Sequence, residues 1–173
     1  MATYKKGFKK QTSEQMLLQV IVGVIIAVIV FVLIAFVYDI ATRVPEYSDY
    51  TKVEKYEDVF TQEDESENPI EKYMVYFYFD ECEGCSDISK DVLKLANRIT
   101  KNGGVFMVAN TTDMTDKDTN LDDFLDAIEV TTGLQAPLLV TVVDGEPAGV
   151  YVGTDAVVDA LTSVKEGTYE PFN

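Results

Sequence analysis

The sequence contains no histidine and only two cysteines, which narrows the chemistry open to it. Without histidine there is no Ser-His-Asp triad, and the side chain that most often serves as a metal ligand or a general base is missing. A structural zinc site needs about four ligands, whereas this chain offers two thiols and no imidazole. The sequence also has no P-loop and no G-x-G-x-x-G motif, so we expect neither a metal nor a cofactor.

Positive charge is scarce and unevenly placed. The chain has 30 acidic and 14 basic residues, a formal net charge of -16. The first 15 residues carry +3, because four lysines face one glutamate there, whereas 29 acidic and 10 basic residues follow position 38. A negatively charged surface repels nucleic acid, and the sequence has no cluster of basic residues that would bind phosphate groups there. We therefore predict no nucleic-acid partner.

One long apolar segment, residues 16–38, contains no charged residue. A helix needs about 20 such residues to cross roughly 30 Å of hydrocarbon. The segment is longer than the apolar region of a cleaved signal peptide, which usually runs about 7–15 residues, so we predict an uncleaved signal anchor. Lysine-rich flanks stay cytoplasmic, and the basic tail over residues 1–15 precedes the span. We expect a single-pass protein of the cell membrane with a cytoplasmic N-terminus and an extracytoplasmic C-terminal domain.

Beyond the span, residues 39–50 are predicted to form an acidic stalk, in which Tyr47 and Tyr50 suit the outer membrane interface. Residues 51–173 are predicted to form the outward domain. Its hydrophobic periodicity favours, in chain order, a short helix within 49–60, a buried strand 72–79, a helix 86–99, a strand 105–110, a polar loop 111–120, a helix 121–130, a hairpin of strands 137–143 and 148–153, a helix 155–166 and a surface tail 167–173. The core order β-α-β-α-β-β-α implies a mixed sheet with helices on its faces.

Both cysteines lie in the short stretch F-D-E-C-E-G-C-S-D, where Cys82 and Cys85 are three residues apart. Two cysteines placed at random would rarely fall at this spacing, which is that of a redox couple. A purely structural disulfide is disfavoured, because closing so small a loop removes little entropy from the unfolded chain. The polar neighbours indicate exposure. A redox-active dithiol is the favoured interpretation, and an inert pair and a partial metal site are the alternatives.

Three features together resemble the thioredoxin family over roughly residues 50–167. The C-x-x-C motif follows a buried strand and begins an amphipathic helix. Pro137 opens the hairpin P-L-L-V-T-V-V-D-G-E-P-A-G-V-Y-V-G, which is similar to the cis-proline hairpin of that family. The order of elements also agrees. The resemblance implies a thioredoxin-like α/β fold with a mixed central sheet, carried here on a single N-terminal transmembrane helix.

The resemblance also implies the roles of four residues. Cys82 would be the attacking thiol, exposed at the helix N-terminus where backbone N–H groups and the helix dipole favour the thiolate. Cys85, less exposed, would resolve the mixed disulfide. The backbone at Ala136 and Pro137 would lie against the dithiol and pair with the substrate chain like an added strand.

Five further positions modulate this expected site. Glu81 stands where the family carries a tryptophan, and Glu83-Gly84 replaces the family's usual dipeptides. Tyr76 occupies the place of a buried acid that thioredoxins use as a proton relay. Together with Glu81 and Glu83, Asp80 surrounds the dithiol with negative charge, and these three residues form its acidic collar. Because negative neighbours disfavour a thiolate, we expect a reducing to intermediate potential, although the same charges also suit the steering of basic substrates.

The function expected from the sequence is that of a membrane-anchored thiol-disulfide oxidoreductase, more a reductase than an oxidase. Its partners would be extracytoplasmic proteins with thiols or disulfides, together with a membrane redox partner, since one cysteine-free span cannot carry electrons. An accessory protein dedicated to one exported disulfide-bonded peptide differs only in substrate range. The alternative is a non-catalytic thioredoxin-fold binding subunit of a membrane secretion, conjugation or peptide-export complex, with incidental cysteines.

Overall fold

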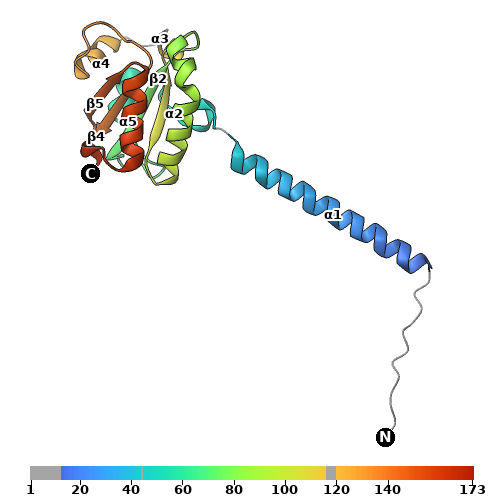
Figure 1. Cartoon of the computed structure of the whole chain (residues 1–173). Coiled ribbons are helices and arrows are strands. Elements are labelled where there is room, and N and C mark those ends of the chain that lie inside the picture. Colours follow the sequence, from blue (N-terminus) through green and yellow to red (C-terminus); the bar gives the residue numbers. More distant parts are fainter. Residues whose placement is uncertain (1–12, 44, 116–119) are drawn as a thin grey trace. The chain divides into compact units, whose positions relative to one another are not determined.

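The computed structural model describes residues 13–43, 45–115 and 120–173 (Figure 1). The chain divides into two compact units between Arg43 and Val44. Most of the basic tail predicted over residues 1–15 lies outside the described residues.

The first unit consists of one long helix, α1, over Ser13–Thr42. Within its segment Ser13–Tyr38 an 18-residue window has a mean hydropathy of 3.6, and the segment is long and apolar enough to cross a membrane. It is the one such helix in the described part of the chain, and a signal sequence near an N-terminus meets the same criterion. The large apolar side chains of this segment are exposed. The helix is therefore compatible with the anchor predicted over residues 16–38.

The second unit is built on a five-stranded mixed sheet in the order β1-β3-β2-β4-β5. The crossover from β2 to β3 makes these two strands parallel, whereas β2 pairs antiparallel with β4, and β4 with β5. The described strands are β1 (Thr51–Lys52), β2 (Lys72–Tyr78), β3 (Phe106–Asn110), β4 (Leu138–Val143) and β5 (Glu146–Val152).

Helices cover both faces of this sheet. The α-helices are α2 (Glu83–Lys101), α3 (Thr111–Thr115), α4 (Leu121–Ala127) and α5 (Thr154–Glu166), and the 3-10 helices are η1 (Tyr47–Asp49), η2 (Tyr56–Phe60) and η3 (Glu170–Phe172). Helices α2 and α5 lie side by side on one face (Figure 1), and α4 and η2 belong to the core of the other. The predicted mixed sheet with helices on both faces is confirmed, and the chain from β2 to α5 follows the predicted order, with α3 and α4 together in the place of the second helix.

Strand β2 is the centre of both cores. Its side chains from Tyr73 to Phe77 are at most 1% exposed, and they alternate between the two faces. Met74 and Tyr76 pack beneath α2 and α5, whereas Tyr73, Val75 and Phe77 pack toward α4 and η2. The apolar run that predicted a doubly buried strand thus forms one, because each alternate side chain meets a different layer.

Two predicted segments differ from the structure. The helix expected within 49–60 is instead the short edge strand β1, which pairs with β3, followed by η2. The loop expected over 111–120 begins with α3, because the fully buried Met114 draws this stretch onto the core. Residues 116–119 of that loop lie outside the described part.

The segment predicted as a stalk, residues 39–50, falls in both units. Helix α1 continues to Thr42, whereas Tyr47 and Tyr50 belong to the second unit and pack against its core. The Tyr50 hydroxyl donates to the carbonyl oxygen of Leu93 at 3.2 Å, and its ring meets Phe106 edge-on at 5.1 Å. Aromatic rings gain more by packing on the sheet and α2 than by remaining in water.

The prediction that residues 167–173 form a surface tail is wrong at Tyr169. This side chain is 7% exposed, and its hydroxyl lies 2.7 Å from the Thr141 hydroxyl, which is itself fully buried. The Tyr151 hydroxyl donates to the same Tyr169 oxygen at 2.9 Å. The C-terminal segment therefore satisfies a polar group inside the β4–β5 region and closes that edge of the core.

We predict that Tyr169→Ala lowers the free energy of unfolding by about 3 kcal/mol, through the lost ring and the cavity it leaves. Tyr169→Phe keeps the ring and removes only the hydroxyl, so it should cost about 1 kcal/mol. Urea unfolding of the full chain in detergent micelles, followed by the near-ultraviolet circular dichroism of the tyrosines, measures both changes. Two variants with wild-type midpoints would show that the tail does not pack.

Candidate functional site

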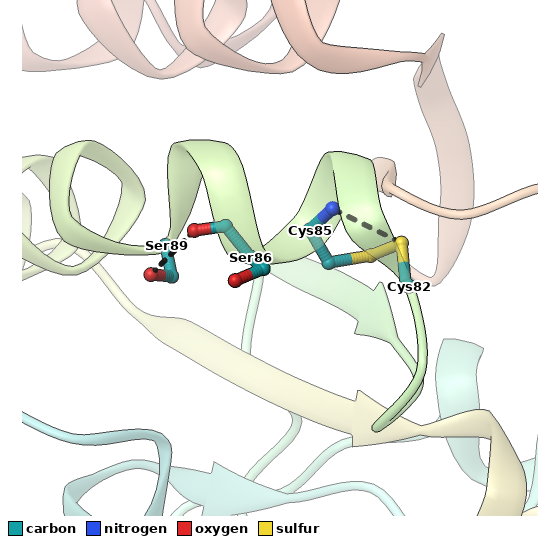
Figure 2. The surroundings of a disulfide bond; sticks show 4 residues. All are labelled: Cys82, Cys85, Ser86 and Ser89. Carbon is teal, nitrogen blue, oxygen red and sulfur yellow. Dashed lines mark hydrogen bonds between the residues drawn. A yellow bond between two sulfur atoms is a disulfide. The ribbon is translucent and has the colours of Figure 1, made fainter.

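Cys82 and Cys85 form a disulfide at the N-terminus of α2. Cys82 is the N-cap residue, and its Sγ accepts a hydrogen bond from the backbone N–H of Cys85 at 3.0 Å (Figure 2). The first N–H groups of a helix have no partner within the helix, and here one of them points at sulfur. Both predicted catalytic residues are thus brought together in the expected place, in their oxidised form.

The expected difference in exposure between the two cysteines is absent. Cys82 is 6% exposed and Cys85 is 4% exposed. Two walls border this motif: Pro137 packs against Gly84 at the start of α2, and Tyr47 and Tyr78 line a groove that reaches both cysteines. A partner therefore meets two largely buried sulfur atoms rather than a protruding thiol.

The first wall is the turn before β4. The peptide bond between Ala136 and Pro137 is cis, as the resemblance implies for this hairpin, and Pro137 is buried whereas Ala136 is partly exposed. A Cβ atom placed on Gly84 would come within 3.3 Å of Pro137 Cδ and 3.4 Å of Thr154 Cγ2. The Gly84 position of the motif thus lies directly against Pro137, one of the two predicted substrate-contacting residues.

The acidic collar is exposed. Asp80 and Glu81 lie in the turn before Cys82, and Glu83 begins α2; all three side chains face solvent. Asp80 accepts a hydrogen bond from the side-chain amide of Asn110 at 3.2 Å. None of the three carboxylates forms an ion pair with a described residue, so their negative charge beside the sulfurs is not neutralised by a cation. This charge opposes the helix N-terminus, which favours a thiolate at Cys82.

Tyr76 lies in the core of the domain and has no exposed surface. Its ring belongs to a near-parallel group with Tyr47 and Tyr78, at centroid distances of 5.9 and 6.2 Å. Burial, and secondarily the neighbouring Tyr47, raises the pKa of Tyr76 far above its ordinary value. The Tyr76 hydroxyl therefore stays neutral at physiological pH and does not replace a buried carboxylate as a proton acceptor.

Sequence reasoning missed the second wall of the site. Tyr47, Tyr78 and Phe79 border a groove of about 250 Å³ that reaches both cysteines. Tyr47 belongs to the segment predicted as a stalk. Its ring stacks on that of Tyr78 with a centroid distance of 4.2 Å, which joins segments that lie far apart in the sequence. In the sequence, Tyr76 and Tyr78 lie on the same face of the predicted strand, and two such rings favour a further aromatic ring packed against them.

The described residues hold no other group with evident chemistry. No cluster of three or more cysteine, aspartate or glutamate side chains among them is arranged to hold a metal ion. A larger hollow of about 460 Å³ lies at the opposite end of β2, near Lys72 and the C-terminal ends of α2 and α5, and no cysteine lines it. The chemistry of this part of the chain is concentrated at the disulfide.

Comparison with family models and with curated proteins finds no match. Solved structures with a similar fold include the oxidised mitochondrial thioredoxin 3 of Saccharomyces cerevisiae, at 19% identity and a TM-score of 0.46, covering 72% of this chain and 97% of that one. They also include the thioredoxin of Plasmodium falciparum, at 15% identity and a TM-score of 0.47, covering 68% and 97%. The thioredoxin of Fasciola hepatica is similar at 18% identity and a TM-score of 0.46, covering 69% and 97%.

The packing at Gly84 makes a prediction about the proline turn. Gly84→Val should slow disulfide exchange about tenfold and cost about 1–3 kcal/mol of stability, because its γ-methyl groups press on Pro137 and Thr154. Gly84→Ala should be nearly neutral, because its tight contacts are offset by a gain in helix propensity of about 1 kcal/mol. The rate at which the reduced protein reacts with glutathione disulfide measures the effect. A Gly84→Val protein that reacts at the wild-type rate would contradict it.

Proposed function

We propose that this protein is a membrane-anchored thiol-disulfide oxidoreductase that acts on extracytoplasmic proteins through Cys82 and Cys85. The observation that carries the proposal is the Cys82–Cys85 disulfide at the start of α2, with a backbone N–H directed at Cys82 Sγ and Pro137 beside it. A helix N-terminus favours the thiolate that disulfide exchange requires. No metal or cofactor is needed for this chemistry.

In the reductive direction, the reduced protein begins with the Cys82 thiolate. It attacks one sulfur of a substrate disulfide, so that a mixed disulfide forms and the other substrate sulfur leaves as a thiolate, which takes a proton from solvent. Cys85 then loses its proton and attacks Cys82 Sγ, releasing the second substrate thiol. The substrate gains two electrons and two protons, and the Cys82–Cys85 disulfide is restored in the protein.

The substrate backbone is expected to dock at the turn before Pro137. Ala136 is partly exposed there and presents a small apolar surface next to Pro137. An extended substrate segment can pair with this backbone as an added strand. Such pairing would align the substrate sulfur with Cys82. The alignment matters because Cys82 is mostly buried and a substrate reaches it with difficulty.

The charges around the dithiol favour reduction of substrates over oxidation. Strong oxidants owe their potential to an unusually stable thiolate, whereas the unneutralised Asp80, Glu81 and Glu83 destabilise one here. A reductase must be reduced again after each turnover. We propose that a membrane protein with its own dithiol supplies the two electrons, since the apolar segment of α1 contains no cysteine.

We place the protein in the cell membrane through α1, with its basic N-terminal tail in the cytoplasm and the second unit outside. The support for this is the apolar segment Ser13–Tyr38 and the excess of lysine before it. Lysine-rich flanks are retained on the cytoplasmic side. The acidic second unit would then meet its substrates at the outer surface.

A second candidate is a binding subunit of a membrane complex that uses the thioredoxin-like fold without redox turnover. The neutral, fully buried Tyr76 favours it, because the site lacks a buried acid to take the proton of Cys85. If the protein is an oxidoreductase, the lack of a buried acid implies that the substrate is released from the mixed disulfide more slowly than the mixed disulfide forms.

Cysteine substitutions separate the two candidates. For the oxidoreductase, Cys82→Ser should abolish reduction of an insulin-type disulfide substrate, whereas Cys85→Ser should retain the first attack and accumulate mixed disulfides with substrate. Trapped species, visible as thiol-sensitive bands on non-reducing gels, should vanish in the Cys82→Ser, Cys85→Ser double variant. A Cys82→Ser protein with full biological function would instead identify a binding subunit.

The reduction potential tests the proposed direction. We expect the Cys82–Cys85 couple of the full chain, equilibrated in dithiothreitol or glutathione buffers, to lie below about -220 mV. Replacing Glu81 and Glu83 with glutamine should raise the potential, because a thiolate at Cys82 becomes more stable. A wild-type value near -120 mV would assign the protein to the oxidants.

A further inference from the structure

The groove on the second side of the disulfide is distinct from the proline turn. It lies between the start of α2, the turn after β2 and the segment 46–50, and it encloses about 250 Å³ next to Cys82 and Cys85. Pro137 and Thr154 meet the opposite side of the motif, at Gly84. A substrate bound at the proline turn would thus leave this groove open to the residues that flank its reacting cysteine.

The groove wall is held rigidly. In segment 46–50 the backbone N–H of Glu46 donates to the carboxylate of Asp49 at 2.8 Å, which caps η1. Tyr47 then stacks on Tyr78 with a centroid distance of 4.2 Å and an angle of 19° between the rings. The hydrogen bond from Tyr50 to Leu93 fixes the end of the segment on α2. The wall is therefore preorganised, and a ligand does not need to order it.

The groove combines an aromatic wall with negative charge. Asp80 lines it, and among the residues that the structure describes no lysine or arginine does. Burial raises the pKa of Tyr78, and smaller contributions in the same direction come from Tyr47, Asp80 and Asp113, so both carboxylates act on this ring. The long apolar stem of a lysine or arginine packs well against such rings while its charged end reaches a carboxylate.

We propose that this groove is a second substrate subsite, which selects disulfide-containing polypeptides with a lysine or arginine next to the reacting cysteine. The side-chain stem would lie along Tyr47 and Tyr78, and the cationic end would pair with Asp80. The inference rests on the proposed oxidoreductase function and specifies its substrate class. Charge complementarity is the reason for a cationic occupant, since acidic or neutral side chains gain nothing from Asp80.

The test compares three disulfide-linked peptides that differ only in the residue beside one cysteine: lysine, alanine or glutamate. The reduced full chain in detergent micelles is mixed with each peptide, and the second-order rate of disulfide cleavage is followed by fluorescence. We expect the lysine peptide to react about tenfold faster than the glutamate peptide at low salt, with the ratio shrinking at high ionic strength.

A matched pair of variants locates the effect. Asp80→Asn removes one negative charge from the groove with almost no change of shape, and should lower the lysine-to-glutamate ratio about threefold. Asp91→Asn removes the same charge from an exposed position of α2 outside the groove, and should leave the ratio near its wild-type value. Because both side chains are exposed, neither change is expected to prevent folding.

A third variant tests the aromatic wall. Tyr47→Ala should lower the cleavage rate of the lysine peptide more than that of the alanine peptide, because the long apolar stem of lysine loses the ring against which it packs. Tyr47→Phe keeps the ring and should react like the wild type. Circular dichroism checks that Tyr47→Ala is folded; if it is not, the pair at positions 80 and 91 decides alone.

The outcomes separate the inference from the function beneath it. If no peptide disulfide is cleaved, the oxidoreductase proposal itself fails. If all three peptides are cleaved at equal rates, or if Asp91→Asn changes the ratio as much as Asp80→Asn, the protein remains an oxidoreductase and the subsite is refuted.

Discussion

The burial of β2 on both faces is the constraint on which the site depends. A one-residue shift of this strand would exchange the side chains of its two cores, so its register is strongly fixed. The chain leaves β2 after Tyr78 and returns as α2, which places Cys82 at the helix N-cap. The antiparallel neighbour β4 begins directly after Pro137, and this pairing brings the proline turn to the same end of the sheet.

The electrostatics of the disulfide combine two opposing effects. The backbone N–H of Cys85 favours negative charge on Cys82, whereas the exposed carboxylates beside it disfavour such charge. The site thus lacks the one-sided stabilisation of a thiolate on which strongly oxidising dithiols depend. The neutral Tyr76 beneath adds no proton acceptor. These features are the basis of the proposed reductive direction and of the slow release proposed for the mixed disulfide.

The two sides of the disulfide differ in chemistry. Pro137 and Ala136 offer backbone and small apolar groups, which suit any extended polypeptide. Tyr47 and Tyr78, with Asp80 at their edge, offer a shaped aromatic wall and a single charge. Through Tyr47, residues 46–50 thus supply part of the surface that borders the two cysteines.

The sequence alone determined the apolar segment 16–38, the order of the strands and longer helices from β2 to α5, and the place of Cys82 and Cys85 at the start of α2, because these follow from local periodicity and spacing. Only the tertiary structure decided which distant residues meet. Tyr47 joins Tyr78, and Tyr169 joins Thr141, across long stretches of chain. A lone tyrosine in a polar segment has no local pattern to reveal its partner; its burial depends on the surface that the rest of the fold presents.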